Sequence, residues 1–240
     1  MRCFITKIKL KIIPSKVSNE EFCEFVRSQG IEVGKGTIFY QPETVEIDKQ
    51  RPWMVTIGEY CKITRGVIIL QHDYSRSVLR RVYGDIVAES KRTIIRNNVF
   101  IGMNSIILMG ANIGNNVIIG AGSIVSGNVP DNVVIAGNPA KIIRTLDEHY
   151  NIRKLKYVKE AKECAKEFYR KYKRKPNVSD LGAFFPMFAD RTEEYLKNNH
   201  INYKLGGDNP EDILKCFLIS DKIYKNFQEF LDDIDFEDGL

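Results

Sequence analysis

Aliphatic side chains recur at every sixth residue through much of the first 130 positions, in two runs separated by an interruption. The aliphatic positions are Ile57, Ile63 and Ile69, then Ile95, Ile101, Ile107, Ile113, Ile119 and Val125. Four places after each comes Cys61, Val67, Asp73, Val99, Ser105, Ala111, Val117, Ser123 or Val129, all of them small or β-branched except Asp73. A six-residue period matches neither a helix, at about 3.6, nor an alternating strand, at about 2.

The period instead predicts a coil in which each hexad forms one short strand and one corner. The aliphatic residue points inward, the small residue shares the interior near a corner, and Gly or Asn permits the tight turn. Stacked coils pair their strands in parallel and bury a continuous core that no single repeat could bury alone. We therefore predict an all-β parallel β-helix.

A weaker first coil is expected to start near residue 31. The same frame holds at Val33, Phe39 and Val45. Pro42 and Pro52 predict corners or breaks within this coil. Further along, residues 75–94 interrupt the repeat, and the frame resumes two residues out of phase. An insertion of this length must leave the coil as a loop, and long ordered loops are usually functional.

The two ends of the chain follow other patterns. Residues 7–13 predict a strand, and a capping box from Ser18 to Glu21 opens a short helix that ends at Gly30. A second capping box, from Thr145 to Glu148, opens an amphipathic helix that ends before Pro176. Two further helix starts are expected at the motifs that begin with Asp208 and Ser220.

These patterns predict three parts of the chain. Residues 1–30 form an N-terminal strand and helix, residues 31–144 form the repeat domain with its excursion at 75–94, and residues 145–240 form a helical extension. The sequence does not state what the extension does.

Composition restricts the class of protein. No apolar run approaches the ~18 residues of a membrane span, and the N-terminus lacks a signal-peptide core, so we expect a cytoplasmic protein without stable membrane insertion. The five cysteines are scattered, which argues against a disulfide framework and a zinc site. Residues 153–175 carry eleven Lys or Arg against three Glu. We interpret them as a solvated helix face and expect no nucleic-acid partner.

Two segments carry a specific family resemblance. Residues 113–125, IGNNVIIGAGSIV, and residues 134–144, VIAGNPAKIIR, resemble the hexapeptide-repeat acyltransferases, most of all the maltose, galactoside and polysaccharide O-acetyltransferases. The resemblance covers roughly residues 31–144. It implies a left-handed coil, an exception to the usual handedness of parallel crossovers, with acetyl-CoA as co-substrate, no metal, and a homotrimer.

His72 is the candidate general base. It stands at a corner just before the excursion, and residues 67–74 resemble the family segment that holds the catalytic histidine. A sugar hydroxyl is a weak nucleophile, so its attack on a thioester needs a base whose pKa lies near the working pH, which histidine provides. Asp73 is adjacent, but consecutive side chains of an extended segment point apart, so the group that orients His72 is left open.

The remaining candidate site residues come from the resemblance. The sequence Phe100-Ile101-Gly102-Met103 nominates the backbone N–H of Met103 as the oxyanion donor, a role that tolerates the change of side chain. The resemblance places the pantetheine arm of acetyl-CoA near Ala121 and Ser126. It places the phosphates of acetyl-CoA at Lys141 and Arg144.

The excursion beside His72 is a candidate acceptor-binding wall, with Arg80 and Tyr83 as its nominated residues, although a solvent-facing flap fits the sequence equally well.

These assignments predict direct transfer of an acetyl group from acetyl-CoA to a hydroxyl of a sugar or polysaccharide precursor. The alternative is N-acetylation of an amino sugar or a nucleotide-linked amino sugar, which the sequence barely separates from O-acetylation. A γ-class carbonic anhydrase would need three zinc-bound histidines, and the coils contain only His72. A sugar-nucleotide pyrophosphorylase would need an N-terminal nucleotide-binding domain, and the thirty residues before the repeat are too few to form one. A non-catalytic scaffold of the same architecture stays open.

Overall fold

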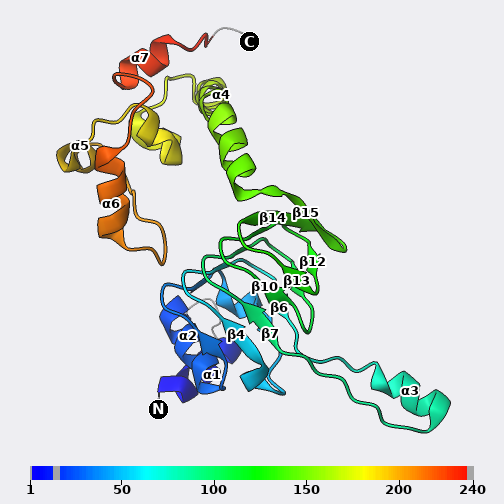
Figure 1. The fold of residues 1–240 in the computed structure, drawn as a ribbon. Coiled ribbons are helices and arrows are strands. Elements are labelled where there is room, and N and C mark those ends of the chain that lie inside the picture. Colours follow the sequence, from blue (N-terminus) through cyan, green and yellow to red (C-terminus); the bar gives the residue numbers. More distant parts are fainter. Residues whose placement is uncertain (1, 13–16, 237–240) are drawn as a thin grey trace. The chain divides into compact units, whose positions relative to one another are not determined.

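The structure is a computed structural model that describes residues 2–12 and 17–236 (Figure 1). The chain divides into two compact units, Met1–His149 and Tyr150–Leu240. The first unit contains the repeat and the second unit is helical.

Three sheets of short strands build the first unit, and all of the pairings are parallel except that of the last strand, β15. The first sheet runs through β1 (Glu32–Val33), β4 (Val55–Ile57), β7 (Thr93–Ile95), β10 (Asn112–Ile113) and β13 (Asn128–Val129). The second sheet runs through β2 (Ile38–Phe39), β5 (Lys62–Ile63), β8 (Phe100–Ile101), β11 (Ile118–Ile119), β14 (Val133–Gly137) and β15 (Ala140–Thr145). The third sheet runs through β3 (Glu46–Ile47), β6 (Ile68–Ile69), β9 (Ile106–Ile107) and β12 (Ile124–Val125). The chain visits the sheets in turn, which makes it a parallel β-helix, as the period predicted.

The inward column of each sheet is the aliphatic position of the repeat. Ile57 pairs with Ile95, and Ile95 pairs with Ile113, so each isoleucine stacks on the next coil's isoleucine. All nine aliphatic positions of the two runs are at most 1% exposed. Full burial of one such side chain is worth about 1.5–3 kcal/mol, so this column is the main source of stability in the first unit.

The first coil departs from the predicted frame at one position. Val33 and Phe39 are buried as expected, but the third inward residue is Ile47, paired with Ile69, whereas Val45 is only partly buried. The reason is a 3₁₀ helix, η2 (Pro42–Thr44), which inserts residues at the corner before β3. A second 3₁₀ helix, η3 (Pro52–Met54), marks the next break, so both prolines mark irregular corners.

The interruption of the repeat is a projecting arm, defined here as residues 73–92 (Figure 1). Ile57 and Ile95 stack although they lie 38 residues apart, whereas Ile95 and Ile113 lie 18 apart. The arm therefore adds twenty residues to one coil without changing the stacking. It contains helix α3 (Arg76–Tyr83), which Gly84 ends with the left-handed φ of 75° that favours glycine.

The N-terminal segment corrects one prediction. The strand expected at 7–13 is wrong for its described part, because Arg2–Ile12 is helix α1, and residue 13 lies outside the described residues. A strand needs a partner strand, and α1 instead packs on helix α2 (Asn19–Ser28). The predicted Ser18–Glu21 capping box is present at the start of α2. The ring of Phe22 meets the ring of Phe39 edge-on at 5.0 Å, so α2 covers the first coil.

The second unit has a core of its own. Helix α4 (Leu146–Tyr172) begins at the predicted capping box, where Thr145 and Glu148 bond each other's backbone N–H, and it runs into this unit. It is followed by η4 (Val178–Met187), α5 (Glu193–Asn198), α6 (Pro210–Ile219) and α7 (Phe227–Asp232). The predicted start at Asp208 is confirmed, with Asn209 as the N-cap. The start expected at Ser220 is wrong, because Ser220 ends α6 and the next helix is capped by Asn226.

Only the middle of the apolar stripe of α4 is buried. Ala161 and Ala165 are fully covered by the helical core, whereas Leu155 is 84% exposed. Among the described helices, none is long and apolar enough to cross a bilayer.

Candidate active site

His72 lies at the corner where the chain passes from the third sheet toward the first, which we name the His72 corner. Its Nδ1 is in hydrogen-bond contact with Oδ2 of Asp48. Asp48 follows β3 in the coil before, and its N–H donates to the Ile69 carbonyl at 2.9 Å. The stacking of the first two coils therefore brings together two side chains that are 24 residues apart.

The pair is held in a partly dry environment. The side chain of His72 is 13% exposed and that of Asp48 is 9% exposed. A carboxylate at Nδ1 favours the tautomer with the proton on Nδ1, so the lone pair lies on Nε2. The ring is thus fixed in orientation and presents a basic nitrogen.

Asp73 has a different partner. Its carboxylate accepts hydrogen bonds from the Ser75 hydroxyl at 2.7 Å and from the Ser75 N–H at 3.0 Å. These bonds lower the pKa of Asp73. The sequence gives a reason against Asp73 as the orienting group, but it does not reveal Asp48. The register of the irregular first coil decides which residue of that coil lies opposite His72.

A hollow of about 350 Å³ opens beside the pair. It is lined by Glu46, Ile47, Asp48, Lys49, Leu70 and His72. The hollow therefore combines apolar walls with one base, two carboxylates and one ammonium group, which is the usual mixture of a small-molecule site.

Met103 and Ala121 lie at a different corner, where the chain passes from the second sheet to the third; we name it the Met103 corner. The two belong to successive coils, and the N–H of Gly122 donates to the Met103 carbonyl at 2.8 Å. A Cβ on Gly102 would stand 2.5 Å from the Ala121 nitrogen, so only glycine allows the two coils to approach this closely. Both Met103 and Ala121 are exposed.

Lys141 and Arg144 lie on the last strand of the second sheet. β15 pairs antiparallel with β14, with Lys141 opposite Ala136 and Arg144 opposite Val134. Residues three apart in a regular strand face opposite sides, but a bulge between Val134 and Ile135 adds one residue to β15. The bulge therefore puts both cations on the outer face of the sheet.

The predicted catalytic and pantetheine-binding residues form two groups within one chain. His72 and Ser126 lie at the His72 corner, with Asp48 added by the structure, whereas Met103 and Ala121 lie at the Met103 corner. One triangular coil keeps its corners apart, so a single chain does not bring the His72 imidazole to the Met103 N–H.

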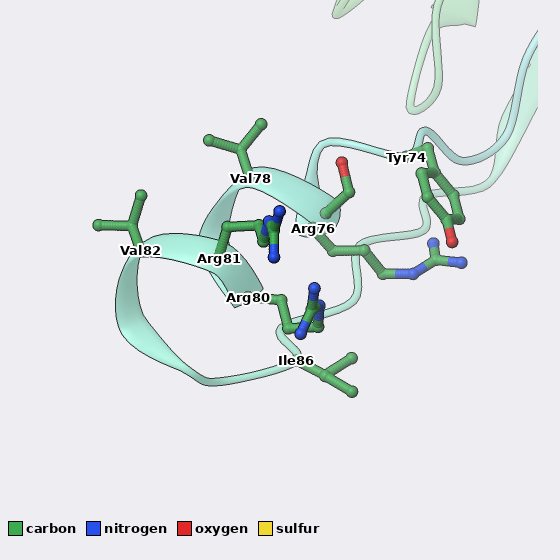
Figure 2. Close-up of a pocket in the computed structure, with 8 residues that line it drawn as sticks. Tyr74, Arg76, Val78, Arg80, Arg81, Val82 and Ile86 are labelled. Carbon is green, nitrogen blue, oxygen red and sulfur yellow. The ribbon is translucent and has the colours of Figure 1, made fainter.

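The arm carries the two nominated acceptor residues. Arg80 lines a second hollow, of about 600 Å³, together with Tyr74, Arg76, Ser77, Val78, Arg81, Val82 and Ile86 (Figure 2). Tyr83 is 76% exposed and does not line this hollow. His72 is not among the residues that line this hollow. It lies at the neck of the arm, where it forms an isolated antiparallel β-bridge with Ser90.

Within residues 2–12 and 17–236 no group of three or more His, Cys, Asp or Glu side chains is arranged to hold a metal ion. Cys61 points into the core, and burial raises the pKa of its thiol.

Known proteins match the coil. Residues 92–127 match the family model described as bacterial transferase hexapeptide (six repeats). Protein CapG of Staphylococcus aureus is 37% identical over 143 residues, which cover 60% of this chain and 80% of that protein. Galactoside O-acetyltransferase of Escherichia coli (strain K12) is 48% identical over 107 residues, 43% of this chain and 52% of that protein.

A solved structure of a hexapeptide-repeat acetyltransferase from Vibrio cholerae, complexed with acetyl coenzyme A, is 20% identical with a TM-score of 0.43, covering 60% of this chain and 85% of that one. The chain belongs to the hexapeptide-repeat acetyltransferase family, and its coil is a left-handed parallel β-helix with a helical C-terminal extension. It spans most of CapG but only about half of the galactoside enzyme.

Proposed function

We propose that the chain transfers an acetyl group from acetyl-CoA to a hydroxyl of a sugar or polysaccharide precursor, with His72 as the general base. The observation that carries the proposal is the contact between His72 Nδ1 and the Asp48 carboxylate beside an open hollow. The likeness to a galactoside O-acetyltransferase supports the acceptor class.

The proposed reaction needs no covalent intermediate. Nε2 of His72 takes the hydroxyl proton while the oxygen attacks the thioester carbonyl, and Asp48 stabilises the imidazolium that forms. The tetrahedral intermediate then expels the CoA thiolate, which receives the proton from the imidazolium. The backbone N–H of Met103 is assigned to the oxyanion, because a fixed donor aimed at developing charge costs no reorganisation.

The donor is assigned to the groove between the coils of two neighbouring copies. Ala121 and Ser126 offer backbone contacts to the pantetheine arm, and Lys141 and Arg144 offer charge-assisted hydrogen bonds to the phosphates. The bulge in the hairpin supports the pair of cations, since it gives both of them the same face.

The active form is proposed to be a homotrimer. His72 and Met103 occupy different corners of one chain, so a complete site needs the His72 corner of one copy and the Met103 corner of another. Contacts between two different patches are head-to-tail, and such contacts form a ring when the rotation between copies closes. The number three comes from the family resemblance.

The first test is a screen of sugars with acetyl-CoA, read out as free thiol release. We expect turnover with a hydroxyl acceptor and a strong loss in Asp48→Asn, with KM nearly unchanged because Asp48 acts through the orientation of His72. Turnover only with amino sugars would establish the N-acetyl alternative. The absence of both turnover and CoA binding would refute the proposal.

The second test mixes two inactive variants. His72→Ala removes the base, and Ala121→Trp blocks the groove at an exposed position of the other corner. Unfolding and refolding the two together should restore activity, since some interfaces then combine an intact His72 corner with an intact Met103 corner. If the mixture stays as inactive as each variant alone, the site lies within one chain and the shared-site assignment is wrong.

A further inference from the structure

Three arginines gather in the hollow of the arm. Arg76 and Arg80 are four residues apart on α3, so they are neighbours on its surface, and Arg81 follows directly. Figure 2 shows the side chains of Arg76, Arg80 and Arg81 near one another, and Val78, Val82 and Ile86 line the same hollow. The Arg76 guanidinium stacks on the Tyr74 ring at 4.4 Å, so its direction is fixed.

The other charges near this hollow are satisfied elsewhere. Lys91 pairs with Glu89 at 2.6 Å, and Arg92 lies 3.7 Å from Glu32. The carboxylate of Asp73 accepts two hydrogen bonds from Ser75, and the nearby Arg76 also helps to lower its pKa without forming an ion pair with it. One Arg76 nitrogen donates to the Asp73 carbonyl at 3.2 Å. Within the described part of the chain, none of the three hollow arginines forms an ion pair with a carboxylate, Asp85 at the tip of the arm included.

This arrangement is unfavourable without an anion. Like charges at four-residue spacing destabilise a helix, and an eight-residue helix is marginal in water even without them. Guanidinium groups are planar forks that match phosphate oxygens with two parallel hydrogen bonds, and several of them around one hollow suit more than one negative charge. The hollow therefore has the chemistry of a phosphate or diphosphate site.

The hollow is also within reach of the proposed base. Arg76 follows His72 by four residues, so their Cα atoms are at most about 14 Å apart. Arg80 is one helical turn, about 6 Å, further along. The long arginine side chains shorten the gap, so a sugar at His72 can extend its phosphate group toward the arm.

We propose that the acceptor is a phosphorylated sugar, carried on a monophosphate or diphosphate that Arg76, Arg80 and Arg81 bind. This inference rests on the proposed acetyl transfer and narrows its substrate class. The phosphate of a nucleotide-linked sugar and that of a lipid-linked sugar have the same chemistry at this hollow, so the experiment separates them.

The kinetic test compares galactose, galactose 1-phosphate, UDP-galactose and galactose linked to farnesyl diphosphate as acceptors for acetyl-CoA. We expect at least tenfold higher kcat/KM with the phosphorylated forms, and the best form identifies the source. The triple variant Arg76→Gln, Arg80→Gln, Arg81→Gln should lose this preference, since charge-assisted bonds are worth on the order of tenfold to a hundredfold each. Equal use of free galactose, or a preference that survives in the triple variant, overturns the proposal.

A matched control removes three exposed charges elsewhere. The variant Lys156→Gln, Lys159→Gln, Lys171→Gln alters α4 and should keep the preference. If it loses the preference as the arm variant does, the effect is one of net charge and the arm site is wrong.

A binding test works even if no galactose acceptor turns over. Pyrophosphate is titrated calorimetrically into the full chain saturated with CoA, so that the donor's phosphate site is already filled. Binding that disappears in the arm variant supports the site, whereas no binding, or equal binding to both proteins, overturns it. The absence of both acetyl transfer and CoA binding would refute the proposed function, and the pyrophosphate titration would still decide the phosphate site.

Discussion

The coil and the arm are joined at one corner, yet they place the same kinds of side chain in opposite surroundings. In the coil, isoleucines such as Ile101 and Ile113 are fully buried, stacked on their counterparts in the next coil. In the arm, Val82 is 66% exposed and Ile86 is 68% exposed. The coil therefore supplies the stability of the first unit, and the arm contributes surface that is free to bind.

This contrast divides the effects of substitutions into two classes. A change in the coil should act on the free energy of unfolding, and a change in the arm should act on binding. His72 and Asp48 lie where the two regions meet, so changes there should affect the reaction and also the stability, because each is the other's partner in a largely buried pair.

The largest effect is expected at that meeting point. His72→Ala should lower turnover by about 10²- to 10⁴-fold while leaving CoA affinity nearly unchanged, because a base acts mainly in the transition state. It should also lower the thermal midpoint, because the largely buried Asp48 carboxylate loses its partner. Steady-state rates and melting curves check this, with His200→Ala in the second unit as the control. Turnover at the wild-type rate with a confirmed acceptor would contradict the mechanism.

Two substitutions that shorten an aliphatic side chain test the difference in stability between the coil and the arm. Ile101→Ala should cost about 2–5 kcal/mol of unfolding free energy, whereas Val82→Ala should stay within about 0.5 kcal/mol. Trp53 is the only tryptophan and lies in η3, so its fluorescence during urea unfolding follows the first unit alone. A comparable loss in both variants would mean that the arm is packed against another surface in solution.

The cations of the coil should bind the donor, acetyl-CoA, and the cations of the arm should bind the acceptor. Lys141→Ala and Arg144→Ala should each weaken acetyl-CoA binding by about 1.5–3 kcal/mol, seen mainly in KM, with less effect on a truncated acetyl-pantetheine donor. Arg80→Gln should leave KM for acetyl-CoA unchanged. Donor affinity that is unchanged in both coil variants would move the phosphate site elsewhere.

The smallest expected effect concerns the stability of the fold at low pH. Asp131 accepts hydrogen bonds from the N–H of Asn115 at 2.7 Å and from its side-chain amide at 3.2 Å, and these bonds lower the pKa of Asp131. A depressed pKa means that the stabilisation is present above the unfolded value of about 3.9 and is lost as pH falls through the folded value. Asp131 joins two coils, whereas the carboxylate of Asp73, whose pKa is lowered in the same direction, accepts its hydrogen bonds from Ser75, two residues away.

Melting curves between pH 6 and about pH 3 compare the two carboxylates. Asp131→Asn should flatten the acid-dependent fall of the thermal midpoint, and Asp73→Asn should change it less. The reverse order would show that the neck of the arm contributes more to stability than the stacking of the last coils.

The sequence predicted the regular parts of this fold because their signal is local. A hexad identifies its own inward residue, so the columns through Ile57, Ile63 and Ile69 followed without a structure. The prediction failed at Val45 in the first coil, because η2 shifts the six-residue spacing there. The same irregularity concealed Asp48 as the partner of His72. The helix at Arg2–Ile12 was missed since its packing on α2 is a tertiary contact that alternation cannot reveal.

The candidate site was predictable only in part for a similar reason. His72 could be nominated from its place at a corner, but its partner comes from another coil, and the separation of His72 from Met103 depends on which corner each one occupies. The spacing of Lys141 and Arg144 would place them on opposite faces, and only the bulge seen in the hairpin puts them together.

The neck of the arm makes the excursion an exchangeable module. The chain leaves and re-enters the coil at adjacent points: His72 bridges Ser90, the Ser90 hydroxyl donates to the Gln71 carbonyl at 3.0 Å, and the Lys91 N–H donates to the same carbonyl at 3.1 Å. Since the ends of the excursion are held side by side, its length and content are uncoupled from the register of the coils that follow. An arm from another protein can therefore be grafted between these points, and under the proposed function this graft should change the acceptor while leaving His72 and the coil in place.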